Sequence, residues 1–89
     1  MAALKARFVA RCEGDLARLR ILTTEGQPDV AETRMLVHGL AGAGATFGFP
    51  DVSTTAGRVD DAYVDGRPPS QADIASLIDA LEAVVTRPS

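Results

Sequence analysis

The stretch that decides the fold is residues 35–50, MLVHGLAGAGATFGFP, which carries no Asp, Glu, Lys or Arg. At about 100° per residue around a helix axis, its large apolar side chains fall on one face: Leu36, Leu40 and Phe47. Gly48 and Pro50 then interrupt the pattern, because glycine often follows a helix end and proline does not continue a helix. The stretch therefore predicts a helix over about residues 28–47, followed closely by another.

Breaker residues divide the rest of the chain in the same way. Glycines and prolines between residues 26 and 28 and between residues 66 and 69 leave three further segments of helical length: about 2–23, 51–65 and 70–86. None of them alternates apolar and polar residues with the period of two that a strand needs. Their apolar residues recur every three or four positions: Leu4, Phe8, Cys12, Leu16, Leu19 and Leu22; Val52, Ala56, Val59 and Tyr63; Ile74, Leu77, Ile78, Leu81, Val84 and Val85.

Two of the four segments begin with residues typical of helix N-termini. Pro28 and Asp29 suit a first turn, where one N–H is unpaired and an acid meets the positive helix end. Ser70 and Asp73 form a capping pair. Connections of about three to six residues favour antiparallel neighbours. The sequence therefore predicts an all-α protein, an antiparallel up-down-up-down four-helix bundle that makes one domain of residues 1–89.

Composition excludes several classes of function. The 89 residues carry a net charge of −3 and no tryptophan, so the chain offers neither a basic field nor an aromatic platform for nucleic acid. No segment approaches the roughly 20 apolar residues of a membrane span. A lone cysteine, Cys12, excludes a disulfide framework, and its place on an apolar stripe indicates a small buried side chain. We expect a cytoplasmic protein and, because the four apolar stripes can be matched within one bundle, a monomer.

The only histidine, His38, points away from the predicted core. The apolar face of its helix centres about 180° from it, as counted at 100° per residue. Within about 60° of His38 on the same scale lie small residues and one cation: Arg34, Ala41, Gly42 and Ala45, with Ala31 and Met35 beside them. An ordinary solvated helix face is charged, whereas this one is nearly bare. His38 is therefore predicted to be an accessible imidazole.

The glycines of this helix need a physical reason, since each costs up to about 1 kcal/mol relative to alanine. Gly44 lies on the apolar face, which predicts the close approach of another helix there. Gly42 lies one turn after His38. A lone surface histidine is most often only a polar surface residue, but these cleared surroundings favour a nucleophile that the active site of another protein can reach.

The string His38-Gly39-Leu40-Ala41-Gly42, continued by AGATFGF over residues 43–49, resembles the pattern of histidine phosphotransfer (HPt) domains of two-component phosphorelays. That pattern is H-x-L-K/A-G, followed by small residues and an F-G or L-G turn. The next predicted helix carries A-x-x-V-D-x-A over residues 56–62, similar to the A-x-x-L-E of the family. The resemblance covers most of the chain, because the family fold is a helical bundle of about this size.

The resemblance implies a phosphate carrier without autonomous kinase activity. His38 would accept a phosphoryl group on Nε2 from the aspartyl phosphate of a response-regulator receiver domain or a hybrid histidine kinase, and would pass it to another receiver. Such a domain has no cofactor of its own, and Mg²⁺ is expected on the partner receiver. Gly42 would leave room for the phosphate and the receiver, so a larger side chain there is expected to block transfer.

The chain departs from the family pattern at Ala41, where many members carry a lysine that balances the phosphate charge. Arg34 lies about one turn before His38 and is a candidate replacement, although it can equally be a solvated surface residue. Asp60 and Asp61 are interpreted as a solvated face, with no carboxylate placed beside His38 to complete a metal site. An alternative function also stays open: a non-catalytic helical adaptor that binds a signalling partner through the same face.

Overall fold

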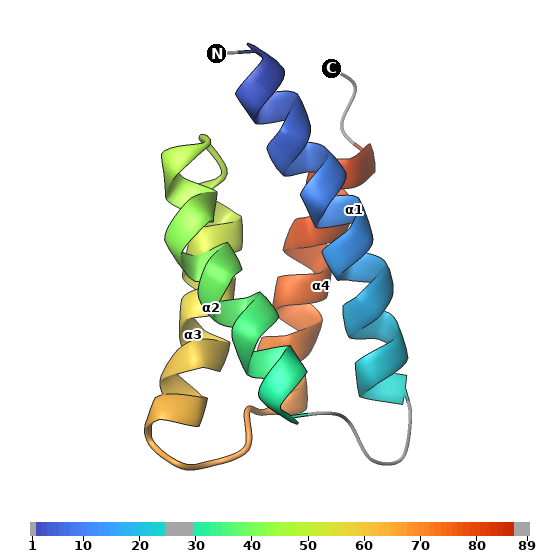
Figure 1. Cartoon of the computed structure of the whole chain (residues 1–89). Coiled ribbons are helices and arrows are strands. Elements are labelled where there is room, and N and C mark those ends of the chain that lie inside the picture. The colour runs from blue at the N-terminus through green and yellow to red at the C-terminus, as the bar shows by residue number, and fades with distance from the viewer. Residues whose placement is uncertain (1, 25–29, 87–89) are drawn as a thin grey trace.

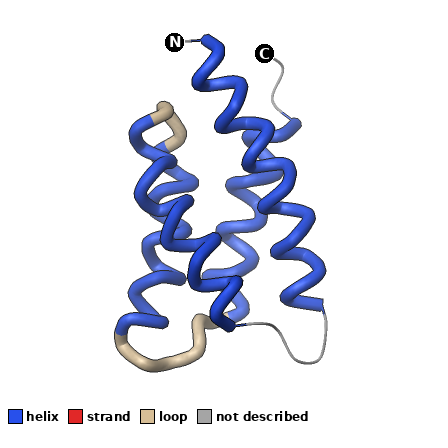
Figure 2. The backbone as a smooth tube through the Cα atoms, in the orientation of Figure 1, coloured by secondary structure: helices blue, strands red, loops and turns tan. Residues whose placement is uncertain are grey.

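The computed structural model describes residues 2–24 and 30–86, which form four helices (Figure 1): α1 (Ala2–Thr24), α2 (Val30–Thr46), α3 (Pro50–Val64) and α4 (Gln71–Thr86). Successive helices run in opposite directions (Figure 1). These described residues contain no strand (Figure 2). The predicted all-α, up-down-up-down four-helix bundle is confirmed. Pro28 and Asp29, expected to begin the second helix, lie outside the described residues.

The core takes side chains from all four helices. Its buried members are Phe8, Cys12, Leu16 and Leu19 of α1, Val37 and Leu40 of α2, Val52, Ala56 and Val59 of α3, and Leu77, Leu81 and Val84 of α4, with Phe49 from the turn between α2 and α3. Leu4, expected on the buried stripe, is 46% exposed, because the first turns of α1 project beyond that turn (Figure 1). Cys12 is fully buried as expected, and burial raises the pKa of its thiol to about 11.

The turn between α2 and α3 is shaped by Gly48. Its φ of 86° lies in the left-handed region that glycine adopts readily. The N–H of Phe49 donates to the carbonyl of Gly44 at 2.8 Å, and the N–H of Gly48 donates to the carbonyl of Ala45 at 3.2 Å, which closes α2 with a Schellman motif. The ring of Phe49 stacks on Phe8 of α1, with 5.5 Å between ring centroids. The turn therefore joins the hairpin to the first helix.

Helices α2 and α3 approach each other closely at Gly44. A Cβ on this glycine would lie 2.7 Å from the backbone nitrogen of Ser53 and 3.1 Å from the carbonyl oxygen of Phe49. Nearby, the hydroxyl of Ser53 donates to the carbonyl of Ala41 at 2.7 Å. The expected role of Gly44 in close helix packing is confirmed, and the contact fixes the register of the two helices.

Ion pairs on the surface link α1 to its neighbours. The guanidinium of Arg18 donates to both carboxylate oxygens of Glu32 on α2, at 2.7 and 2.8 Å. Arg20 pairs with Glu82 on α4. Such exposed pairs contribute little stability each, so the buried core holds the bundle together.

The fourth helix begins with the expected cap. The N–H of Asp73 donates to the hydroxyl of Ser70 at 3.0 Å, which satisfies one of the free donors of the first turn. Within the described residues, no helix combines the length and the apolar character needed to cross a membrane.

Candidate functional site

His38 lies in the middle of α2 with 80% of its side chain exposed. The turn before it carries two longer exposed side chains, Arg34 and Met35. Three other exposed residues in line with it along the helix have no side chain longer than a methyl group: Ala31, Gly42 and Ala45. The imidazole therefore stands on a strip of helix backbone that another molecule can approach closely.

Gly42 keeps the space above the ring open. Helical side chains lean toward the N-terminus, so a side chain at position 42 would cover the turn that carries His38. A Cβ at this position would meet nothing within 4 Å, so the fold itself does not demand glycine here. Helix packing therefore does not explain this glycine, and the absence of its side chain leaves the turn that carries His38 uncovered.

Asp60 of α3 contacts the imidazole from the side. Its Oδ2 lies 3.2 Å from Nδ1 of His38, and its side chain is only 20% exposed. The expectation that Asp60 lies on a solvated face is therefore wrong, whereas its neighbour Asp61 is exposed as expected. Because a carboxylate only accepts hydrogen bonds, Nδ1 has to be the donor in this contact. In the tautomer that carries its proton on Nδ1, Nε2 keeps its lone pair.

The contact between His38 and Asp60 follows from the hairpin register. In two antiparallel helices joined by a tight turn, residues equally far from the turn lie opposite each other. His38 and Asp60 are each eleven residues from Phe49 in the sequence. A count outward from the predicted turn could therefore have placed Asp60 beside the histidine, which helix-by-helix periodicity could not.

Arg34 is held one turn before His38, on the side that faces α3. Its guanidinium carbon lies 5.7 Å from the ring centroid of Tyr63, an arrangement typical of a cation–π contact. Tyr63 is half-buried, and burial raises the pKa of its hydroxyl against the opposing effect of Arg34. Among the described residues, no carboxylate forms an ion pair with Arg34.

The two flanks of the exposed strip differ. Toward α3, Ala41 is half-buried and packs against the core, so it forms the edge of the strip rather than part of its open surface. Toward α1, the guanidinium of Arg11 covers Gly39, where a Cβ would overlap its Nη2. Arg11 also pairs with Asp15, one turn further along α1, at 3.3 Å. His38 therefore lies between the half-buried Ala41 on one flank and the Arg11–Asp15 ion pair on the other, in which the two charges balance.

Comparison with protein families decides what this arrangement belongs to. The family model described as "Hpt domain" matches residues 3–87, nearly the whole chain. The chain belongs to the Hpt domain family. No curated protein and no solved structure matches it. Hpt domains take part in phosphotransfer within two-component phosphorelays, where they interact with receiver domains or kinases and act as phosphocarriers rather than catalysts.

In this Hpt domain, the expected resemblance is confirmed by the match over residues 3–87. Four of the residues expected at the site are exposed on α2, His38, Arg34, Gly42 and Ala45, and Ala41 is half-buried at their edge. Asp60 and Tyr63, which contact His38 and Arg34, were missed by the sequence prediction. Both missed residues lie on α3, so neither belongs to the H-x-L-K/A-G string of α2. No three or more His, Cys, Asp or Glu side chains cluster as metal ligands in the part of the Hpt domain that the structure describes.

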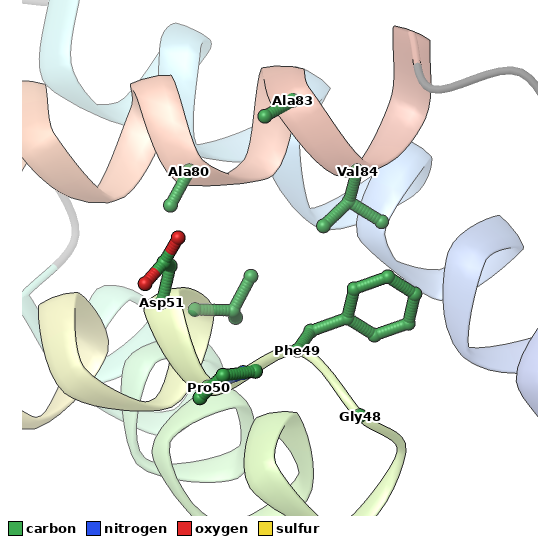
Figure 3. A pocket seen from close by; sticks show the side chains of 8 residues that line it. Gly48, Phe49, Pro50, Asp51, Ala80, Ala83 and Val84 are labelled. Carbon is green, nitrogen blue, oxygen red and sulfur yellow. The ribbon is translucent and has the colours of Figure 1, made fainter.

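A shallow cavity of about 230 Å³ lies elsewhere in the Hpt domain, where the turn before α3 meets α4. Ala80, Ala83 and Val84 of α4 line one side, opposite Phe49, Pro50 and Asp51 (Figure 3). Its lining contains none of the predicted site residues. The exposed strip around His38, rather than this cavity, is therefore the candidate functional site.

Proposed function

We propose that His38 accepts a phosphoryl group on Nε2 from the aspartyl phosphate of a response-regulator receiver domain or a hybrid histidine kinase, and passes it to the aspartate of another receiver. The observation that carries the proposal is the contact between Asp60 and Nδ1 of an imidazole whose outer face is bare. A surface histidine that takes part in no reaction needs neither a carboxylate at Nδ1 nor small residues around its ring.

Asp60 prepares the ring for this reaction in two ways. By accepting a hydrogen bond from Nδ1–H, it selects the tautomer in which Nε2 is unprotonated and therefore nucleophilic. It also restrains the plane of the ring, while the exposed remainder of the imidazole leaves Nε2 accessible to the incoming phosphorus. Holding a nucleophile in its reactive direction lowers the entropic part of the barrier.

The number of protons on the His38 ring does not change during the transfer. The Nε2 lone pair attacks phosphorus, the N–P bond forms, and the P–O bond to the donor aspartate breaks with its electron pair on the departing carboxylate. The ring acquires a positive charge, which the nearby Asp60 carboxylate stabilises. The reverse step, with the carboxylate of a second receiver as the nucleophile, returns the ring to its starting tautomer.

The proposal divides the chemistry between this domain and its partner. The receiver supplies Mg²⁺ and the acidic pocket, while this domain has no cofactor of its own and no autonomous kinase activity. This domain contributes the nucleophilic Nε2 of His38, held in position for the transfer. We expect it to act as a cytoplasmic monomer that neither binds nucleic acid nor enters membranes.

The receiver would dock on the exposed strip and its apolar margins. Met35 on α2 is 69% exposed and Val64 at the end of α3 is 71% exposed. Gly42 and Ala45, on the other side of His38 along α2, offer backbone and methyl surface. Apolar groups beside a bare helix strip fit a transient partner that must bring its own active site over His38.

Arg34 is proposed to balance the charge of the phosphoryl group in place of the lysine that Ala41 replaces. Removing it with Arg34→Ala should slow transfer to His38 and shorten the lifetime of the phosphohistidine. Arg58→Ala is the matched control, because Arg58 is also exposed but lies about 160° around α3 from Asp60. Unchanged rate and lifetime in Arg34→Ala would remove Arg34 from the proposed site.

The proposed function is tested by incubating the domain with a panel of phosphorylated receivers. We expect acid-labile, base-stable phosphate to appear on the wild-type domain and not on His38→Gln. If no receiver of the organism's set transfers phosphate but one still binds the His38 face, the non-catalytic adaptor is the correct function instead.

A further inference from the structure

We infer that Tyr63 is a positioning residue that holds the guanidinium of Arg34 beside the phosphorylated ring of His38. The inference rests on the proposed function and adds a residue of α3 to it. His38 and Asp60 form one pair across the two helices, and Arg34 and Tyr63 form the next pair, one helical turn away.

Tyr63 is suited to this role because its own position is fixed. It is half-buried and packs against the core cluster, whereas Arg34 is exposed on the helix surface. A free arginine side chain samples many rotamers, and ordering it lowers the benefit of any contact that it makes. With its guanidinium carbon 5.7 Å from the ring centroid, Arg34 is already confined to the side of α2 that faces α3.

The contact with Tyr63 leaves Arg34 able to bind phosphate. The ring lies on one side of the guanidinium, whose several N–H donors spread around its plane and remain available to an anion. Helical side chains generally lean toward the preceding turn, which for His38 is the turn that carries Arg34. A phosphoryl group on Nε2 would therefore extend toward donors that are already oriented.

Other described cations are less suited to this role. Arg11 lies on the opposite flank over Gly39 and is paired with Asp15. Position 41, which carries lysine in many family members, holds only a methyl group. The need for a cation is increased by Asp60, which places a carboxylate next to the phosphorylated ring.

The test measures the equilibrium distribution of phosphoryl groups between a receiver and the domain. Tyr63→Leu keeps an apolar side chain of similar depth but removes the ring, and should shift the equilibrium about two- to fivefold toward the receiver, the range expected of an exposed cation–π contact. Tyr63→Phe keeps the ring and should behave as wild type. In an Arg34→Gln background, Tyr63→Leu should cause no further shift, because its partner is already absent.

The outcomes separate this inference from the proposed function. A wild-type equilibrium in Tyr63→Leu, an equal shift in the Arg34→Gln background, or a loss in Tyr63→Phe would each overturn the positioning role. If Tyr63→Leu does not fold, Arg34→Lys replaces it, since lysine keeps the charge but lacks the planar group, and a wild-type equilibrium in Arg34→Lys would overturn the role too. Failure of the wild-type domain to accept phosphate at all would contradict the proposed function itself.

Discussion

At the scale of single residues, the chemistry of His38 is set by what lies next to each ring nitrogen. Nδ1 faces the carboxylate of Asp60 at 3.2 Å, and the rest of the ring is exposed. Gly42 leaves the surface on the other side open. In the proposed mechanism, Asp60 selects the tautomer and Gly42 permits access, and each residue can be changed separately.

Gly42→Gln tests access. The new side chain would lean over His38, so transfer should fall by roughly a hundredfold, the loss expected when reacting groups are held apart by about an ångström. The fold should survive, because a Cβ at this position meets no other atom within 4 Å. Gly14→Gln on α1 is the matched control, since Gly14 has equally open surroundings. Wild-type transfer in Gly42→Gln would show that the space above the ring is not needed.

Asp60→Ala tests tautomer selection. Loss of a charge-assisted hydrogen bond should slow phosphoryl transfer to His38 about tenfold. Asp60→Asn should slow transfer less, because its amide oxygen can still accept a hydrogen bond from Nδ1–H. The neighbouring Asp61→Ala makes the same change of charge on an exposed residue and should leave the rate unchanged. Equal losses in Asp60→Ala and Asp61→Ala would point to a general electrostatic effect instead.

At the scale of elements, the hairpin of α2 and α3 builds the site. Periodicity within each segment predicted which face of α2 is buried and that Gly44 meets another helix. It could not show which residue of α3 faces His38, because that depends on register, which Gly48 and the contact between Gly44 and Ser53 set. Asp60 was therefore missed by analysis of single helices.

Gly44→Ala tests this register. Its methyl group would lie 2.7 Å from the backbone nitrogen of Ser53, so the two helices would have to separate. We expect a loss of about 1–3 kcal/mol in the free energy of unfolding, the usual effect of overpacking, measured by urea denaturation. Gly42→Ala in the same helix should instead stabilise the domain, by up to about 1 kcal/mol. Equal stability of the two variants would contradict the close approach at Gly44.

At the scale of the whole molecule, the buried core that stabilises the bundle and the exposed candidate site are formed by different residues. The core is formed by all four helices, while the candidate site uses only the outer side of α2 and one edge of α3. The apolar stripes predicted most of this core from sequence, since burial follows helical periodicity. Leu4 is exposed, because periodicity does not reveal where a helix extends beyond its neighbours. Four other residues of the predicted stripes are only partly buried and pack against the core: Tyr63, Ile74, Ile78 and Val85.

The buried thiol of Cys12 gives a pH-dependent test of this core. Its pKa is about 11 in the folded domain and 9.0 in a free thiol, so between these values the unfolded chain loses a proton that the folded chain keeps. Stability should therefore fall as pH rises from about 9 to 11, and Cys12→Ala should lack this part of the slope. Parallel curves for the two proteins from pH 8 to 11 would show that the thiol ionises equally in both states.

The most direct test of the account is the NMR spectrum of the domain labelled with ¹⁵N in histidine, which is unambiguous because His38 is the only histidine. After transfer from a phosphorylated receiver, we predict ³¹P coupling to Nε2 of His38 and a proton on Nδ1. Before transfer, we predict the Nδ1–H tautomer in the wild-type domain and a shift toward the Nε2–H tautomer in Asp60→Ala. Phosphorus coupled to Nδ1, or an Nε2–H tautomer in the wild-type domain, would contradict it.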